Sequence, residues 1–352
     1  MARRSKHIVN RRGNRTHKPR KDALKAQKPV QLDSKKLKEL YSTMLKCRMI
    51  AEKARLLVKQ GNFAGDFFTA TGQEAAEVGA LIDLLAEDCI APGRRDCTAR
   101  FIRGMPLKLI FAHLYARQAG RGDGFPSALP RKHGQPSMIA PSFSVSAQLN
   151  FATGAAWAAK MHRSPNVAVI VSGDDSVSLS FWRDAVNFSI AHKLPVVHMV
   201  HNNAGDGSIR TRLGLPGTDL TTNTRGPSLP AFTVDGNDVV AVYRVAQEAI
   251  RRARQGYGPA LIECQTYRWC SQLETDSAKH LPSTAEPERS ADPLSMMETY
   301  LKQKGLCSDS WKCRLMEGFA RELDKAVAFA ERSLQPGENV AHITPPPLAT
   351  AS

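Results

Sequence analysis

The sequence predicts an α/β protein with a mostly parallel sheet and helices on both of its faces. Two short apolar runs rich in Val and Ile, residues 167–172 and 194–200, are each bounded by turn-forming residues and are typical of buried strands. Between them, residues 178–192 carry apolar side chains at nearly helical spacing. A strand, a crossover helix and a second parallel strand make one right-handed βαβ unit.

The segments that precede this unit are predicted to be mainly helical. Residues 33–60 have apolar positions near helical spacing, and Asp33 or Ser34 is the expected N-cap. A second helix is expected from Glu74 to Leu85, after Gly72. A third is expected over residues 106–118, because it has a proline in its first turn and Gly120 just past its end.

A long loop and one more helix complete this half of the chain. Residues 119–146 are rich in Gly, Pro and Ser, which predicts a loop. A loop of this length inside a compact domain is commonly functional. Residues 147–160 are rich in small side chains, which predicts a closely packed helix directly before the first strand of the βαβ unit.

The second half of the chain continues the alternation of strands and helices. Residues 204–230 contain many glycines and prolines and predict another irregular segment. Short strands are expected at residues 232–234 and 259–266, with an amphipathic helix over residues 237–255 between them. Residues 293–333 have a helical pattern.

Length and composition allow one large domain or two medium ones, and we expect one large domain. We expect it to span residues 33–334, between a basic arm at 1–32 and a Pro-rich tail at 335–352. No run of eighteen apolar residues occurs, so no membrane span is expected. The 7 cysteines contain no Cys-x-x-Cys pair, which favours free thiols in a reducing compartment, the cytoplasm, over a disulfide framework or a zinc site.

The net charge of +16 is concentrated near the N-terminus. Residues 1–28 hold eleven Lys or Arg against the single Asp22, a net charge of +10. Three interpretations remain open for this arm. It is a solvated disordered tail, an arm that contacts nucleic acid phosphates through charge alone, or an Arg-rich transit peptide.

Candidate ligands for a metal follow the two strands of the βαβ unit. Asp174 comes directly after the first strand and Asn203 after the second. The carboxyl ends of parallel strands share one edge of a sheet, where open α/β sheets bind ligands. A carboxylate and an amide oxygen at that edge suit Mg²⁺ that shares its coordination shell with a phosphate. The alternative is a βαβ unit with ordinary turn residues.

The spacing of these residues resembles a known fingerprint. Gly173-Asp174-Asp175, twenty-six further residues and then Asn202-Asn203 are similar to the thiamine diphosphate motif. Over roughly residues 33–305 the chain resembles the alpha subunit of the thiamine diphosphate-dependent dehydrogenase component of 2-oxo acid dehydrogenase complexes. Other matches follow in family order: Thr71-Gly-Gln-Glu-Ala75, Arg94-Arg-Asp96, Ala152-Thr-Gly-Ala-Ala156, Asp184-Ala-Val-Asn187, Val234-Asp-Gly-Asn-Asp238 and Thr266-Tyr-Arg268.

The resemblance implies a thiamine diphosphate-binding fold and a set of site residues. Mg²⁺ would be bound by Asp174, Asn203 and the carbonyl group of Gly205. Arg95 would contact the diphosphate through its planar set of donors, and Val145 would contact the aminopyrimidine through its backbone. The remaining cofactor-binding positions implied by the match are Arg94, Gly173, Asp175 and Ser176.

The same resemblance implies a reaction and its partners. The family carries out oxidative decarboxylation of a small 2-oxo acid and transfers the acyl group to lipoyl. It does so as an α₂β₂ heterotetramer with a separate beta subunit, and it delivers the acyl group to a lipoyl-bearing acyltransferase.

Three positions depart from the family pattern. Asp175 replaces a glycine beside the diphosphate, where a second negative charge would repel the cofactor. Ile139 and Gln272 stand where the family carries active-site histidines, and neither side chain can transfer a proton by titrating. These departures keep open a second hypothesis, a catalytically impaired relative with an assembly or regulatory role. A nicotinamide-dependent dehydrogenase is disfavoured because no Gly-x-Gly-x-x-Gly turn opens a helix after a strand.

Overall fold

The computed structural model describes residues 31–61, 70–93, 95–117, 137–139, 145–177, 180–203, 229–266 and 292–334. Residues 1–30 of the predicted basic arm and the predicted tail lie outside the described residues. None of the described helices is long and apolar enough to cross a membrane.

The described strands form one parallel sheet in the order β2-β1-β3-β4-β6-β5. The register of β3 and β4 runs from Ala168 beside Val196 to Gly173 beside His201. The predicted βαβ unit is therefore confirmed. The strands are β1 (Cys89–Ala91), β2 (Ser137–Met138), β3 (Ala168–Gly173), β4 (Val196–Asn202), β5 (Ala231–Asp235) and β6 (Ala260–Gln265).

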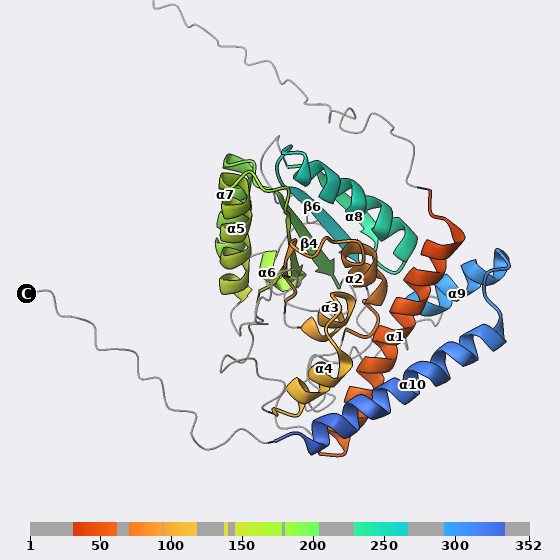
Figure 1. The fold of residues 1–352 in the computed structure, drawn as a ribbon. Coiled ribbons are helices and arrows are strands. Elements are labelled where there is room, and N and C mark those ends of the chain that lie inside the picture. The colour runs from red at the N-terminus through yellow and green to blue at the C-terminus, as the bar shows by residue number, and fades with distance from the viewer. Residues whose placement is uncertain are drawn as a thin grey trace, which may run out of the picture. The chain divides into compact units, whose positions relative to one another are not determined.

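Helices cover both faces of this sheet, as the sequence predicts (Figure 1). Helices α2 and α8 pack on one face, and α5 and α7 pack on the other. The helices are α1 (Ser34–Lys59), α2 (Glu74–Leu81), α3 (Asp96–Ile102), α4 (Leu107–Leu114), α5 (Val145–Met161), α6 (Asp174–Val177), α7 (Ser180–Ala191), α8 (Val239–Arg254), α9 (Pro293–Gln303) and α10 (Asp309–Arg332).

The central strands are apolar because both of their faces are buried. Along β3, Val169 and Val171 contribute to the core under α2 and α8, whereas Ala168 and Ile170 contribute to the core under α5 and α7. Successive side chains of a strand point to opposite faces, so a parallel strand covered on both sides reads as a continuous apolar run. Two further apolar clusters join α1 to α9 and α1 to α4 and α10.

The observed start of a helix agrees with the predicted start where a capping side chain fixes it. The side chain of Asp33 accepts a hydrogen bond from the backbone N–H of Lys36 at 2.7 Å, so Asp33 is the N-cap of α1. The predicted second helix ends at Leu81 rather than at residue 85. The helical pattern of residues 293–333 is two helices, because the chain turns at Gly305, whose φ is +67°, and α10 then begins after Ser308.

The thiols fit the expectation of free cysteines. All 6 cysteines in the described part of the chain are free. Burial, and then the neighbouring Asp96, raise the pKa of Cys97 to about 12. Burial, and then Glu263, raise that of Cys264 to about 12. Thiols that stay protonated are poor nucleophiles and poor metal ligands, so these two cysteines are structural.

The turn after β5 requires glycine at position 236. The backbone N–H of Gly236 donates to the carbonyl oxygen of Gln265 at 2.7 Å. A Cβ at this position would overlap Cγ2 of Thr266 and lie 2.8 Å from the carbonyl oxygen of Gln265.

We expect Gly236→Ala to lower the free energy of unfolding by about 1–3 kcal/mol, measured by chemical denaturation, because of this overlap. The matched control is Gly318→Ala on α10, where an added Cβ meets no atom within 4 Å. The control should raise stability by about 0.5–1 kcal/mol. Equal effects of the two substitutions would contradict the close approach at Gly236.

Candidate active site

The candidate site lies where the strand connections diverge at the carboxyl edge of the sheet. From β1 the chain passes to β2 on one side, and from β3 it passes to β4 on the other side. The carboxyl ends of β1 and β3 therefore flank a topological switch point, which is the usual ligand crevice of an open α/β sheet. The chain after β1 carries Arg95, and the chain after β3 carries Asp174.

The turn after β1 lies against the end of β3 and leads to Arg95. Gly93 has a φ of +73°, and an added Cβ would lie 3.2 Å from the carbonyl oxygen of Val171. The backbone N–H of Gly93 donates to Oε1 of Gln148 on α5 at 3.0 Å. Arg95 then precedes α3. These contacts hold the turn against both β3 and α5.

A buried carboxyl group faces Arg95 from α2. Burial raises the pKa of Glu77 well above its ordinary value, although the charge of Arg95 opposes the shift. Glu77 is 1 % exposed, and this burial disfavours the charged form of its carboxyl group.

Asp174 directly follows β3 and opens the short helix α6. Its side chain is buried, with 4 % exposure, and Ser176 on the same helical turn is 2 % exposed. Gly173, the last residue of β3, is paired in register with His201 of β4. Asp174 is one residue past this pair and Asn203 is two residues past it, so both follow the sheet at the same place.

Asn203 is fixed by side chains from two other elements. Its Oδ1 accepts hydrogen bonds from Nε2 of Gln73 at 2.6 Å and from Oγ1 of Thr266 at 3.1 Å. Its Nδ2 donates to the carbonyl oxygen of His201 at 3.3 Å. Gln73 precedes α2 and Thr266 follows β6, so the amide lies at the meeting point of three segments.

The supporting shell around Asn203 is charged and buried. Asn202 donates from Nδ2 to Oε1 of Glu263 at 2.6 Å, and both residues are almost fully buried. Beside Gln73, the side chain of Glu74 accepts a hydrogen bond from the backbone N–H of Gly72 at 3.0 Å and forms a salt bridge with Arg48. Glu74 therefore anchors the segment that carries Gln73.

Asp174 offers a carboxylate to a cation at this edge, whereas Oδ1 of Asn203 already accepts two hydrogen bonds and would bind a cation only on release of the bond from Gln73 or Thr266. In the described part of the chain, no group of three His, Cys, Asp or Glu side chains could hold a metal ion alone. A Mg²⁺ ion at this edge would therefore take most of its ligands from outside these side chains, such as phosphate oxygens and water. Oε1 of Gln73 is buried with no hydrogen-bond partner in the described structure, so the site has an unused acceptor beside Asn203.

Comparison with known proteins decides the family. Residues 41–338 match the family described as "Dehydrogenase E1 component".

The chain belongs to the dehydrogenase E1 component family.

The E1 relatives cover most of the chain. The alpha subunit of 2-oxoisovalerate dehydrogenase from Bacillus subtilis (strain 168) is 31% identical over 312 residues, which are 87% of this chain and 92% of the relative. The "Pyruvate dehydrogenase E1 component subunit alpha" from Staphylococcus aureus (strain Mu50 / ATCC 700699) is 28% identical over 305 residues. Those residues are 86% of this chain and 80% of the relative. The resemblance predicted from the sequence is confirmed.

The structure brings together only part of the site predicted for this E1 chain. Gly173, Asp174, Ser176 and Asn203 lie at the carboxyl edge, with Arg95 at the neighbouring strand end. Val145 begins α5, and Asp175 lies on α6, but their side chains are outside the described part. Three predicted positions lie wholly outside the described residues: Arg94, Gly205 and Gln272.

Two residues that contact Asn203 were not predicted as site residues. Gln73 lies in the Thr71-Gly-Gln-Glu-Ala75 match, and Thr266 begins the Thr-Tyr-Arg match. Both residues therefore lie in motifs that the sequence already shows. Neither motif shows which strand end it meets, because their hydrogen bonds span 130 and 63 residues of sequence.

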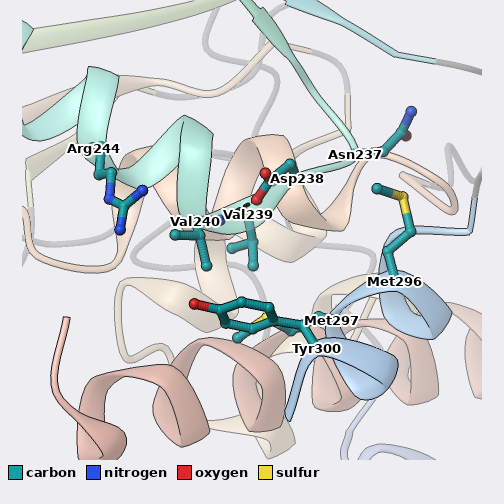
Figure 2. A pocket seen from close by; sticks show the side chains of 8 residues that line it. All are labelled: Asn237, Asp238, Val239, Val240, Arg244, Met296, Met297 and Tyr300. Carbon is teal, nitrogen blue, oxygen red and sulfur yellow. Dashed lines mark hydrogen bonds between the residues drawn. The ribbon is translucent and has the colours of Figure 1, made fainter. Parts of the chain in front are cut away.

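A pocket of about 270 Å³ lies at the same edge of the E1 sheet, beside the end of β5 (Figure 2). Figure 2 shows Val240 of α8 facing Tyr300 of α9, with Arg244 farther along α8. The one carboxylate among its lining residues, Asp238, already caps α8 by accepting from the backbone N–H of Val240 at 2.9 Å. The carboxylate of this pocket is therefore engaged in capping a helix, and the β3 and β4 ends remain the candidate site.

A buried histidine makes this E1 chain sensitive to acid. Burial lowers the pKa of His198, on β4, to about 4 from its ordinary value of 6.5. Neither ring nitrogen has a hydrogen-bond partner within the described residues. In the unfolded chain this histidine binds a proton below about pH 6.5, whereas in the folded chain it does so only below about pH 4. The neutral histidine therefore contributes its full share of stability above pH 6.5, and that contribution is lost as the pH falls from 6.5 towards 4.

We expect His198→Leu to remove this loss. Between about pH 7 and pH 4.5, the free energy of unfolding of the parent should fall by about 2.5 kcal/mol more than that of the variant, measured by urea denaturation. The matched control, His162→Leu, changes an exposed histidine and should behave as the parent. Equal acid losses in the parent and in His198→Leu would contradict the assignment.

Proposed function

We propose that this chain is the alpha subunit of a 2-oxo acid dehydrogenase E1 component. In this proposal it carries out thiamine diphosphate- and Mg²⁺-dependent oxidative decarboxylation of a small 2-oxo acid, together with a beta subunit in the cytoplasm. The acyl group then passes to a lipoyl-bearing acyltransferase. Membership of the E1 family and the acid–amide pair at the carboxyl edge support the proposal.

Each side chain at the edge has a role in this proposal. Asp174 and Asn203, with the carbonyl group of Gly205, bind Mg²⁺, and the cation binds the diphosphate. Arg95 contacts the same diphosphate, with Arg94 beside it. Ser176 and the backbone of Gly173 and Asp175 line the diphosphate side, and the backbone of Val145 contacts the aminopyrimidine. The bound thiazolium ring supplies the electron sink for decarboxylation.

The exposed face of α5 supports a partner subunit beside this site. Phe151, Trp157 and Met161 are 65%, 44% and 71% exposed, and they lie on one side of the helix. Large apolar side chains grouped on a surface mark an interaction site. Because α5 begins at Val145, the N-terminal part of this face, at Phe151, lies nearest the proposed site, and a beta subunit there could supply an acid–base group.

The observation that carries the proposal is the register of β3 and β4, which brings Asp174 and Asn203 to adjoining strand ends. The test is to co-express the chain with a beta-type subunit, purify the complex and quantify bound thiamine diphosphate. About one cofactor per alpha subunit is expected. A folded complex that holds none, even after incubation with Mg²⁺ and the cofactor, would contradict the proposal.

The position of Ile139 favours a second candidate function. Its side chain, which stands at a family histidine position, is partly buried against the core beneath α5 and α7. Isoleucine cannot move a proton, and a general acid or base contributes roughly 10²–10⁴-fold to rate. With Gln272 at the other family histidine position, a complex that binds cofactor but decarboxylates no 2-oxo acid would indicate an assembly or regulatory role.

A further inference from the structure

A second surface of the chain has the features of a peptide-binding groove. A trough of about 610 Å³ lies between the middle of α1, the turn that joins α3 to α4, and the C-terminal half of α10. Figure 1 shows α10 running beside α1 and α4. Its apolar lining comes from Phe101, Met105, Leu107, Phe319, Ala326 and Phe329. We call this surface the α10 groove.

The groove shares no lining residue with the carboxyl edge of the sheet. Phe111, Phe319 and Leu323 are buried where α4 packs against α10, and the apolar lining continues from there to Phe329. Phe329, near the end of α10, is 39% exposed. An exposed aromatic side chain beside a hollow is a typical anchor point for a partner side chain.

The charge around the groove is one-sided. Lys46, Lys108 and Lys325 line it, against the single acidic residue Glu322. None of the three lysines forms a salt bridge with any residue in the described part of the chain. By contrast, Lys53 on the same helix as Lys46 pairs with Asp324 at 2.8 Å.

Two of these ammonium groups are held at the aromatic floor. Nζ of Lys46 lies 5.2 Å from the ring centroid of Phe319, and Nζ of Lys108 lies 5.5 Å from that of Phe329. A cation over an aromatic face is weakly attracted to it and keeps its position. The groove therefore presents an apolar lining with lysine ammonium groups beside its aromatic rings.

We propose that the α10 groove binds an acidic amphipathic peptide segment of a partner protein. An aliphatic or aromatic side chain of the segment would enter the trough, and flanking Asp or Glu side chains would pair with Lys108 and Lys325. From Phe319 to Phe329 the wall spans ten residues of helix, about 15 Å, which accommodates two to three turns of a helix laid along it.

Other occupants fit less well. The basic N-terminal arm of this chain, with its net charge of +10, would be repelled by the same lysines. Nucleic acid would satisfy the lysines but would leave the apolar floor without a matching group. The combination of cations and apolar floor is satisfied by an acidic peptide.

The test measures binding of fluorescein-labelled peptides to the full chain by anisotropy. The probe is a twelve-residue peptide in which Leu and Phe alternate with pairs of Asp and Glu. One comparison peptide replaces the apolar residues with Ser, and another replaces the acidic residues with Lys. We expect the acidic amphipathic peptide to bind about tenfold more tightly than either, and less tightly as salt rises.

Variants locate the binding. Lys108→Glu/Lys325→Glu should weaken binding by about tenfold, and Phe329→Ala should weaken it while leaving the salt dependence unchanged. The control Lys35→Glu/Lys59→Glu has the same net charge as Lys108→Glu/Lys325→Glu and also retains the N-terminal arm. Because its substitutions lie outside the α10 groove, it should bind the peptide as the parent does. Equal binding by the two charge-reversed variants would overturn the proposal. The proposal would also be overturned if the chain bound a single-stranded oligonucleotide or phosphatidylserine vesicles more tightly than the acidic peptide, with the same dependence on Lys108 and Lys325.

Discussion

Replacing Asp174 with alanine is expected to abolish binding of thiamine diphosphate to the assembled α and β subunits. Asp174 is the carboxylate that the proposed Mg²⁺ site takes from the buried end of β3. Loss of the negative ligand removes several kcal/mol of cation binding, so affinity should fall by more than about 100-fold. Isothermal calorimetry with Mg²⁺ present measures this directly.

Two variants separate a ligand role from a loss of folding. Asp174→Asn keeps the shape of the side chain and should also lose affinity, because the charge is gone. Asp184→Ala changes an exposed carboxylate on α7 and should bind as the parent. If Asp174→Ala assembles with the beta subunit and binds the cofactor with parental affinity, the metal assignment is wrong.

Breaking the buried ion pair between Arg48 and Glu74 is expected to produce the largest loss of stability. Burial opposes the charge on Arg48, but hydrogen bonds and charges from Glu74 and Asp292 raise its pKa. The guanidinium contacts both oxygens of Glu74 and lies 3.0 Å from Oδ1 of Asp292. The side chain of Glu74 is only 2% exposed, so Arg48→Met would leave a buried carboxylate without its cation.

We therefore expect Arg48→Met to lower the free energy of unfolding by about 3–5 kcal/mol, measured by urea denaturation at neutral pH. The control Lys59→Met removes an exposed cation from the same helix and should change stability by less than about 0.5 kcal/mol. A loss below about 1 kcal/mol in Arg48→Met would show that water or a shifted side chain compensates Glu74. In variants that remain folded, weaker cofactor binding is also expected, because Glu74 anchors the segment that carries Gln73.

The sequence predicts the central βαβ unit well because its strands are buried on both faces. Such strands read as uninterrupted Val- and Ile-rich runs, and their ends place Asp174 and Asn203 at one edge. Strand β1 has three residues and α3 has seven, which is too short for periodicity to detect. The sequence therefore did not predict the strand that brings Arg95 to the site.

The supporting shell of the site could not be predicted from local pattern. The contacts from Gln73 and Thr266 to Asn203, and from Glu263 to Asn202, join strands and turns that are far apart in sequence. Glu263 also lies in a strand whose other buried residues are apolar, where a charged residue breaks the expected pattern. A buried charge of this kind acquires a meaning only when its partner is known.

The most direct test of the account is the position of the cation. Crystals of the assembled α and β subunits, grown with thiamine diphosphate and Mn²⁺ in place of Mg²⁺, would show the metal by its anomalous scattering. We predict a peak about 2.2 Å from a carboxylate oxygen of Asp174 and from Oδ1 of Asn203, with a diphosphate oxygen in the same shell. A metal bound to the diphosphate but out of reach of both side chains would contradict the account.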